Sequence, residues 1–439
     1  MNEKPDLSTL SDEELVAELA QRRAEGRLEM DNLAFELSTE ADARQAGARA
    51  MQAYLDAQAA QQSTASRPCP RCGAACRVRR RLVVRTVRSR HGEHQLARHY
   101  HYCQACAYGF YPLDAVLGLS DEGDLTSRME QVVLDLGLHG TFEESAERFA
   151  LHHGTAISEN LVRRVVDRVG RRAQTHPHLG AQLRAPAAQS PSTLVVEVDG
   201  SMVSTRGADP WREVKVGLVA RGEHFVQNKG RGLVTQARFV ARLGDYEGFK
   251  QALTDALTLE RAWECPRLVV LGDGAPWVWT LADEVCHGAT QILDYPHALE
   301  HATETARVIF GPDDALVALW TTTVERLLWD GRIDDLVHEV EACVFTARGA
   351  ARQALIDLAR YYRTNATRMR YDRYRAAGLP CGSGAVESAH RHVLQKRMKL
   401  AGQHWSPDRA NRLAQLRAAL ATCGPAALYP AIRRTGSYG

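Results

Sequence analysis

The chain has 439 residues, 45% of them hydrophobic, and its formal net charge at pH 7 is +2. This length exceeds what one hydrophobic core supports, so we expect two to four domains. No apolar stretch approaches the roughly 20 residues that a membrane-spanning helix needs, and the acidic, polar N-terminus lacks the pattern of a signal peptide. We therefore expect a cytoplasmic protein without a membrane segment.

The charged residues are unevenly distributed along the chain. Residues 1–62 carry 13 acidic and 6 basic residues, whereas residues 67–102 carry ten arginines and one acid. Residues 388–417 carry seven basic residues and one acid. A single basic block could be a solvated surface, but two separate blocks favour an anionic partner, most often nucleic acid.

Helical spacing opens the chain and a cysteine-rich segment follows it. Leucines and alanines over residues 11–60 predict one or two amphipathic helices, so we interpret residues 1–62 as a helical arm suited to dimerisation. Residues 63–118 hold two C-x-x-C pairs around a strand near 82–87, which is typical of a structural zinc ribbon whose arginines contact DNA phosphates. The expected Zn²⁺ ligands are Cys69, Cys72, Cys103 and Cys106. The alternative ligands are Cys76, His91, His94, His99 and His101.

Residues 119–176 have the pattern of a helix-turn-helix. One helix is predicted over 125–138, Thr141 opens a second with a capping-box pattern, and Ser158 caps a third. Any helical hairpin with arginines would share this pattern, but a recognition helix needs such a basic face. The candidate DNA-binding residues on the third helix are Arg163, Arg164 and Arg168. Residues 177–192, rich in Pro, Ala and Gln, are predicted to be a linker.

From residue 193 the pattern changes to strands alternating with helices. The predicted strands are 193–199, 212–219, about 234–242, 267–272 and 290–293, with helices near 245–260 and 276–285. Asp199 and Asp273 each end an apolar strand and precede a glycine. A turn aspartate is the simpler explanation of either one. Two of them at strand ends of one sheet favour a catalytic role, since α/β sheets place their chemistry there.

A third carboxylate lies much farther along the chain. Residues 297–375 are predicted to be wholly helical, and Glu387 stands near the start of a helix predicted from about 384 past Lys399. A first-turn glutamate favoured by the helix dipole is the simpler explanation. Two aspartates and this glutamate supply the hard oxygen ligands that a two-metal phosphoryl-transfer site requires. The residues expected to place positive charge beside it are His390, Arg391, Lys396, Arg397 and Lys399.

A further catalytic motif occurs in the sequence, and a common phosphate-binding motif does not. His297 and His301 match the H-x-x-E-H pattern of inverted zinc peptidases and would share one helix face. Such a short motif also arises by chance, and no third ligand can be identified. The phosphate-binding G-x-x-x-x-G-K-[ST] loop is absent from the sequence, so an ATP-driven mechanism is not supported.

Together these motifs resemble a known family. Asp199, Asp273 and Glu387 resemble the triad in the RNase H-like core of DDE transposases from bacterial insertion sequences. The blocks that look like the ISKra-four group are Ser383–Ser388, Arg397–Gly402 and Trp405-Ser406. Asp294 and His297 match the [C/D]-x-x-H signature of the wider mutator-like superfamily, and the 114-residue interval from Asp273 to Glu387 resembles its helical insertion.

The resemblance implies a multidomain α+β protein with an RNase H-like core. The core would comprise residues 193–296 and 381–439, with the helical insertion at 297–380. It also implies that Asp199, Asp273 and Glu387 bind two Mg²⁺ ions, that Asp294 and His297 support the site, and that Zn²⁺ is structural. The expected partner is DNA, as terminal repeats and as target, bound by a homodimer or higher multimer in the nucleoid. The alternative is a domesticated, non-catalytic zinc and helix-turn-helix DNA-binding regulator.

Overall fold

The computed structural model describes residues 11–119, 123–174, 184–228 and 231–434. The first ten residues of the predicted arm, residues 177–183 of the predicted linker and residues 435–439 lie outside the described residues. The chain divides into two compact units, Met1–Val132 with Ala146–Ile157, and Val133–Ser145 with Ser158–Gly439. No helix in the described part of the chain is both long and apolar enough to cross a membrane.

Two helices form a hairpin in the first unit, as the spacing of its apolar residues predicts. They are α1 (Asp12–Glu25) and α2 (Asn32–Ala60). Ser11 and Glu14 form a capping box at the start of α1, which satisfies backbone N–H groups that the helix leaves unpaired. Arg27 of the connecting turn lies 2.9 Å from Asp42 of α2, an ion pair that holds the turn against the second helix.

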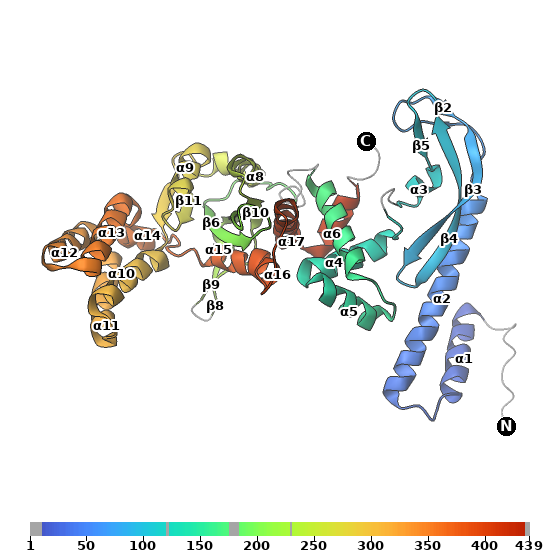
Figure 1. Ribbon diagram of the computed structural model, residues 1–439, viewed down its shortest axis with the longest axis horizontal. Coiled ribbons are helices and arrows are strands. Elements are labelled where there is room, and N and C mark those ends of the chain that lie inside the picture. Colours follow the sequence, from blue (N-terminus) through green and yellow to red (C-terminus); the bar gives the residue numbers. More distant parts are fainter. Residues whose placement is uncertain (1–10, 120–122, 175–183, 229–230, 435–439) are drawn as a thin grey trace. The chain divides into compact units, whose positions relative to one another are not determined.

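A small antiparallel sheet packs against α2. Its strands, in the order β3-β4-β5, are β3 (Val78–Ser89), β4 (Gly92–Cys103) and β5 (Tyr108–Phe110). Two short strands, β1 (Arg67–Pro68) and β2 (Ala75–Cys76), precede it, and the helix α3 (Pro112–Val116) follows. The α2 helix lies along β4 (Figure 1), where the Gln52 amide bonds to both backbone groups of Gln95. The core between them is small and consists of Leu55, Val87, Leu96 and Leu113.

Three helices then follow at the predicted positions. They are α4 (Ser127–His139), α5 (Phe142–His153) and α6 (Glu159–Gln174). The predicted capping box is present, because Thr141 Oγ1 accepts the Glu144 N–H at 3.1 Å and Glu144 Oε2 accepts the Thr141 N–H at 2.8 Å. Ser158 Oγ accepts the Leu161 N–H at 3.2 Å and so caps α6 as predicted.

The second unit is built around a mixed five-stranded sheet in the order β10-β7-β6-β11-β12. The strands are β6 (Leu194–Ser204), β7 (Trp211–Arg221), β10 (Arg238–Leu243), β11 (Leu268–Gly272) and β12 (Thr290–Leu293). The first three pair antiparallel, whereas β6, β11 and β12 run parallel. A 3-10 turn (Gly222–His224) and a separate hairpin, β8 (Phe225–Asn228) with β9 (Arg231–Val234), join β7 to β10.

The strand β6 is longer than its sequence pattern predicts. Pairing with β7 continues from Leu194 to Ser204, so Asp199 lies within the strand, opposite Val216, rather than at its end. The prediction that Asp199 ends a strand is therefore wrong. The apolar run stops there because only the first half of the strand is buried on both faces. The polar second half of β6 stays in strand conformation because its backbone pairs with β7 in an antiparallel hairpin.

Helices cover the sheet and close one of its edges. They are α8 (Tyr246–Leu259), α9 (Pro276–Val285) and α17 (Pro407–Arg434), with a 3-10 turn at Ala262–Glu264 and a kink in α17 at Gly424. The edge strand β10 donates its Phe239 N–H to Thr422 and its Leu243 N–H to Asn411, both on α17. Side chains of α17 thus replace a missing neighbouring strand, which protects the edge.

The predicted helical region is confirmed, and the chain then returns to the sheet. Its helices are α10 (Tyr295–Phe310), α11 (Asp314–Trp329), α12 (Ile333–Thr346), α13 (Gly349–Asn365) and α14 (Tyr371–Ala376), with a 3-10 turn at Ala366–Arg368. They form a bundle (Figure 1) whose core is continuous with that of the sheet. The return consists of α15 (Gly384–Ala389), a π-helical segment (His390–Gln395) and α16 (Lys396–Met398). The helix predicted to run past Lys399 therefore ends before it.

Candidate functional site

Asp199 and Asp273 lie side by side on neighbouring parallel strands. Asp273 directly follows β11, and the pairing of Leu271 with Glu197 puts Asp273 level with Asp199 on β6. Asp199 Oδ1 accepts the Gly200 N–H at 2.6 Å, and Asp273 Oδ1 accepts the Ala275 N–H at 2.9 Å. Burial, the larger cause, and the negative charge of Asp273 together raise the pKa of Asp199 to about 6. The two carboxylates are therefore close enough to repel each other.

Glu387 reaches the same neighbourhood from the first turn of α15. It is exposed, and its charge also contributes to the raised pKa of Asp199. Its carboxylate, the Asp294 carboxylate and the His297 imidazole have ligand atoms that all lie within 4.8 Å of one another. Asp199, Asp273 and Glu387 do not form such a group of three within the described residues. The chain thus brings all five side chains together, but Glu387 lies with Asp294 and His297.

Two buried carboxylates fix the segment that carries Glu387. Asp294 Oδ1 accepts the Ser383 N–H at 2.5 Å, and Glu197 Oε2 accepts the Val386 N–H at 2.8 Å. Both side chains are fully buried, and Ser383, the N-cap residue of α15, makes no side-chain capping bond of its own. The unpaired N–H groups at the start of this helix are therefore satisfied by acids from β6 and from the junction of β12 with α10.

Glu197 was not recognised from the sequence, where it looked like part of an apolar run. A charged residue two positions before Asp199 on a strand must share its face, which is the signal that could have identified it. Burial raises the pKa of Glu197 to about 8, although the Val386 N–H opposes this shift. Its Oε1 has no hydrogen-bond partner among the described residues. The carboxyl group is accordingly a buried, largely protonated acid at neutral pH.

Asp294 also caps α10 and orients His297. Its Oδ2 accepts the His297 N–H at 3.0 Å and lies 2.5 Å from His297 Nδ1. The pKa of His297 is raised to about 9, mainly by the hydrogen bond to Asp294. The negative charges of Asp273 and Asp199 also raise this pKa, whereas burial lowers it. His297 is therefore a cation beside the two aspartates. A protonated imidazole does not ligate a metal.

His390 and Lys399 approach Asp199 from the other side. His390 Nε2 lies 3.1 Å from Asp199 Oδ2, but neither ring nitrogen has hydrogen-bond geometry with any described residue. Burial lowers the pKa of His390 to about 4, so the ring is neutral and the expected positive charge is absent there. Lys399 donates to Ser201 Oγ and supplies a cation near Asp199. His390 also begins the π-helical segment, a feature often found at functional sites.

The inverted peptidase motif does not assemble a metal site. Among the described residues, no metal-ligating group contains both His297 and His301. His301 instead packs against Tyr361 with the rings tilted by 42° and their centroids 4.2 Å apart, and Tyr361 donates its hydroxyl to the Asp273 backbone oxygen at 2.8 Å. His301 thus belongs to the packing of α10 against α13, while His297 belongs to the carboxylate site. Tyr361 is a further residue that the sequence did not identify.

The two cysteine pairs come together as predicted. The sulfur atoms of Cys69 and Cys106 are 3.6 Å apart, those of Cys72 and Cys103 are 3.5 Å apart, and all four lie within 4.8 Å of one another. The backbone N–H of Cys106 is the largest effect on Cys103, whose pKa is lowered to about 6, whereas burial raises the pKa of Cys106, so Cys103 is the thiol that ionises more readily. A thiolate at neutral pH is the form that binds metal. This cluster could hold a metal such as zinc.

The alternative ligands do not join this cluster. Cys76 is buried, its thiol donates to the Ala74 carbonyl, and burial raises its pKa to about 11. His94 bonds to Ser89, and His99 accepts the Leu82 N–H. None of them, nor His91 or His101, belongs to a metal-ligating group in the described part of the chain.

The seven predicted DNA-binding side chains fall into two groups. Those exposed to solvent are Arg163, Arg164, Arg391, Lys396 and Lys399. Arg168 and Arg397 are buried, so neither has the exposure that a phosphate contact requires. Arg397 donates to the Gly137 carbonyl at 3.1 Å between the rings of Phe142 and Trp405, and burial lowers its pKa to about 10. The two arginines were predicted from charge alone, which does not distinguish packed from exposed positions.

No model of a known protein family matches the chain, and no curated protein matches it.

Proposed function

We propose that this protein is a DDE transposase that binds the ends of an insertion sequence and catalyses metal-dependent cleavage and strand transfer of DNA. The observation that carries the proposal is the level placement of Asp199 and Asp273 on adjacent parallel strands. Glu387 joins them from 114 residues farther along the chain. A five-stranded sheet whose order in chain numbering is 3-2-1-4-5, with the second strand antiparallel, supports an RNase H-like core.

The negative charges of Asp199, Asp273 and Glu387 suit the binding of a divalent cation. Asp273 raises the pKa of Asp199, and a bound cation would remove this repulsion. Asp199, Asp273 and Glu387 would hold Mg²⁺, with Asp294 and His297 in support. The ions would supply activation of water and of the 3′-hydroxyl, and stabilisation of the leaving oxygen. No nucleotide cofactor is needed, because strand transfer exchanges one phosphodiester for another.

The protein's own side chains position this chemistry. Asp294 and Glu197 hold the first turn of α15, so the Glu387 carboxylate is directed from a fixed backbone. Cationic His297 and exposed Lys399 place positive charge beside Asp199, where a phosphodiester would approach. The neutral His390 ring is buried, and its Nε2 lies 3.1 Å from Asp199 Oδ2. Arg391 and Lys396, exposed on the following turns, extend this positive surface toward DNA.

The DNA-binding part of the proposal rests on the first half of the chain. Arg163 and Arg164 are exposed on α6, the third of three short helices, which supports a helix-turn-helix. The four-cysteine cluster, proposed as a structural Zn²⁺ site, would hold the arginine-rich hairpin of β3 and β4 as a phosphate-contacting module. A multimer on DNA in the nucleoid is part of the same proposal.

The test is cleavage of duplex DNA carrying the inverted repeats that flank the gene. The wild-type protein should nick these ends only with Mg²⁺ present. Asp273→Asn should lower the cleavage rate by at least about a thousandfold, because one ligand of the reaction centre is lost, and should leave end binding within about twofold. Asp283→Asn on α9, a matched substitution away from the site, should cleave normally. Cleavage that survives in the Asp273→Asn protein would refute the assignment.

A second function is favoured by one observation. Among the described residues, the ligand atoms of Asp199, Asp273 and Glu387 do not all lie within 4.8 Å of one another, as a non-catalytic, domesticated DNA-binding regulator would allow. Such a protein would bind the repeats through the cysteine module and the three helices. It would not nick them at any Mg²⁺ concentration, so the same assay separates the two functions.

A further inference from the structure

A polar cavity of about 300 Å³ lies at the opposite end of the sheet from Asp273. Arg221, the last residue of β7, pairs with Leu194 at the start of β6, whereas Asp273 follows the far end of the parallel strand β11. The charged and polar side chains that line the cavity are Arg184, Arg221, His224, Gln236, Arg238 and Glu260. The cavity is therefore separate from the carboxylate site.

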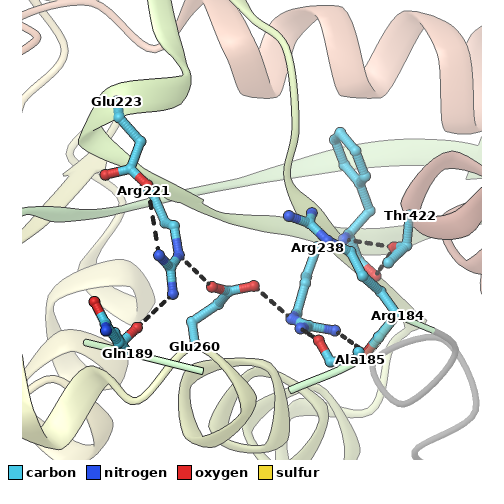
Figure 2. Close-up of polar contacts among 9 residues, drawn as sticks. Arg184, Ala185, Gln189, Arg221, Glu223, Arg238, Glu260 and Thr422 are labelled. Carbon is cyan, nitrogen blue, oxygen red and sulfur yellow. Dashed lines mark hydrogen bonds and ion pairs between the residues drawn. The ribbon is translucent and has the colours of Figure 1, made fainter. Parts of the chain in front are cut away.

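One buried carboxylate holds two of the guanidinium groups in place. Glu260 Oε2 accepts from Arg221 Nε at 2.9 Å, and its Oε1 accepts from Arg238 Nε at 2.7 Å (Figure 2). Arg238 also donates to the carbonyls of Arg184 and Ala185, at 2.9 and 2.6 Å. Glu260 is 3% exposed and Arg238 is 1% exposed, so both are locked in position. A site whose donors are fixed in advance loses little entropy on binding.

The positive charge in this cavity is not balanced. Arg221 and Arg238 share the buried Glu260 carboxylate, and Arg184 lines the same cavity. Among the described residues, the other acid that pairs with Arg221 is Glu223, at 3.4 Å and with an exposed side chain. The half-buried Arg184 guanidinium has no hydrogen-bond or ion-pair partner among the described residues. Burial lowers the pKa of Arg184, and the charges of Arg238 and Arg221 lower it further against the attraction of Glu260. A missing anion would satisfy this group.

We propose that the cavity binds a phosphate group, with Arg184 as its charged donor, because the Arg221 guanidinium already donates to Glu260, Glu223 and the Gln189 carbonyl (Figure 2). A planar guanidinium matches two phosphate oxygens at once, which makes arginine the usual residue for this purpose. His224 and Gln236 line the same cavity and offer further polar groups. The phosphate belongs either to a DNA backbone or to a free small anion. Binding of the group itself does not depend on the proposed transposase activity.

The experiment is calorimetric titration of the full-length protein with inorganic phosphate in a chloride buffer. Arg184→Ala should weaken phosphate binding about tenfold, the loss expected for one charge-assisted contact. Arg184→Lys keeps the charge but not the planar guanidinium, so its phosphate affinity should lie between those of the wild-type and Arg184→Ala proteins. Since the Arg184 side chain has no partner in the part of the chain that the structure describes, both variants should keep the wild-type melting temperature. Arg352→Ala, on the exposed face of α13, removes an equal charge elsewhere and should bind as the wild type does.

A second titration with a short nonspecific duplex identifies the source of the phosphate. If a DNA backbone occupies the cavity, Arg184→Ala should reduce the slope of log affinity against log salt by about one, and Arg352→Ala should not. If a free anion occupies it, phosphate binding should fall while the duplex slope stays unchanged. Equal phosphate binding by the wild-type, Arg184→Ala and Arg352→Ala proteins would overturn the proposal.

Discussion

The four thiols of the cysteine cluster come from two short turns, one between β1 and β2 and one between β4 and β5, within the segment from Cys69 to Cys106. The acids of the carboxylate site come from β6, from the end of β11, from the start of α10 and from α15. The ligands of the first site all come from one short segment, and the hydrophobic clusters in this part of the chain are small. The second rests on a large core that runs from the sheet into the helical bundle. We therefore expect the cysteine cluster to depend on a bound metal for stability and the carboxylate site to depend on the fold.

The difference also concerns what holds each ligand side chain. The cysteines lie in two turns of two separate small sheets, so a metal would cross-link these sheets. Glu387 lies in a short helix that is fixed by two acids remote in sequence, Glu197 and Asp294. The carboxylate site should therefore keep its backbone without metal, whereas the cysteine module should not.

Removing the metal tests this contrast with the largest expected effect. Structural zinc contributes on the order of 10 kcal/mol to small modules of this kind. We expect Cys103→Ser, or chelation of the wild-type protein, to unfold residues 67–110 and to make them sensitive to limited proteolysis. The five-stranded sheet should stay resistant. The measurements are zinc content and the mapped cleavage sites.

A matched substitution controls for loss of a thiol alone. Cys343→Ser on α12 changes a partly buried cysteine that belongs to no metal-ligating group among the described residues. It should retain one zinc per chain and the wild-type proteolysis pattern. Protection of the module after complete removal of zinc would show that the small core suffices, and the contrast would then be wrong.

The buried acid of the second site predicts a pH dependence of stability. The folded-state pKa of Glu197 is about 8 against an ordinary value of 4.5. The unfolded chain therefore releases this proton first, so stability falls as pH rises from 4.5 to 8 and is constant on either side of that window. The slope is roughly 1.4 kcal/mol per pH unit, which amounts to about 5 kcal/mol in total.

Comparison with Glu197→Gln isolates this contribution. The amide oxygen can still accept the Val386 N–H but does not titrate, so the variant should gain stability over the wild type as pH rises through the same window. Urea unfolding at pH 5, 6, 7 and 8, without added divalent metal, measures the difference. A constant difference between the two proteins across these pH values would mean that Glu197 is not the buried acid described above.

The same contrast explains what the sequence could predict. The cysteine pairs, the capping box at Thr141 and the position of Asp273 follow from local spacing, and the structure has them where the pattern puts them. The β6 strand was predicted too short because hairpin pairing with β7 does not depend on apolar residues. Local patterns predict elements well when the cause of the element is itself local.

The contacts that hold the carboxylate site are not local. Glu197 reaches Val386, Asp294 reaches Ser383, and Tyr361 reaches Asp273, each across a long stretch of chain. A single sequence records no such pairs. The burial of Arg168 and Arg397 has the same origin, because packing and not residue type decides which arginines remain exposed.

The smallest expected effect concerns the tether between the helical bundle and Asp273. Tyr361→Phe removes the hydroxyl that donates to the Asp273 carbonyl and should lower the free energy of unfolding by about 1 kcal/mol. Tyr374→Phe removes a comparable bond, to the Thr367 carbonyl, and should cost a similar amount. If the proposed activity holds, only Tyr361→Phe should also slow DNA cleavage severalfold, because it alone loosens the backbone of a reacting carboxylate. Equal cleavage by both variants would place Tyr361 in the general packing of the bundle, and the fold would then support Asp273 through β11 alone.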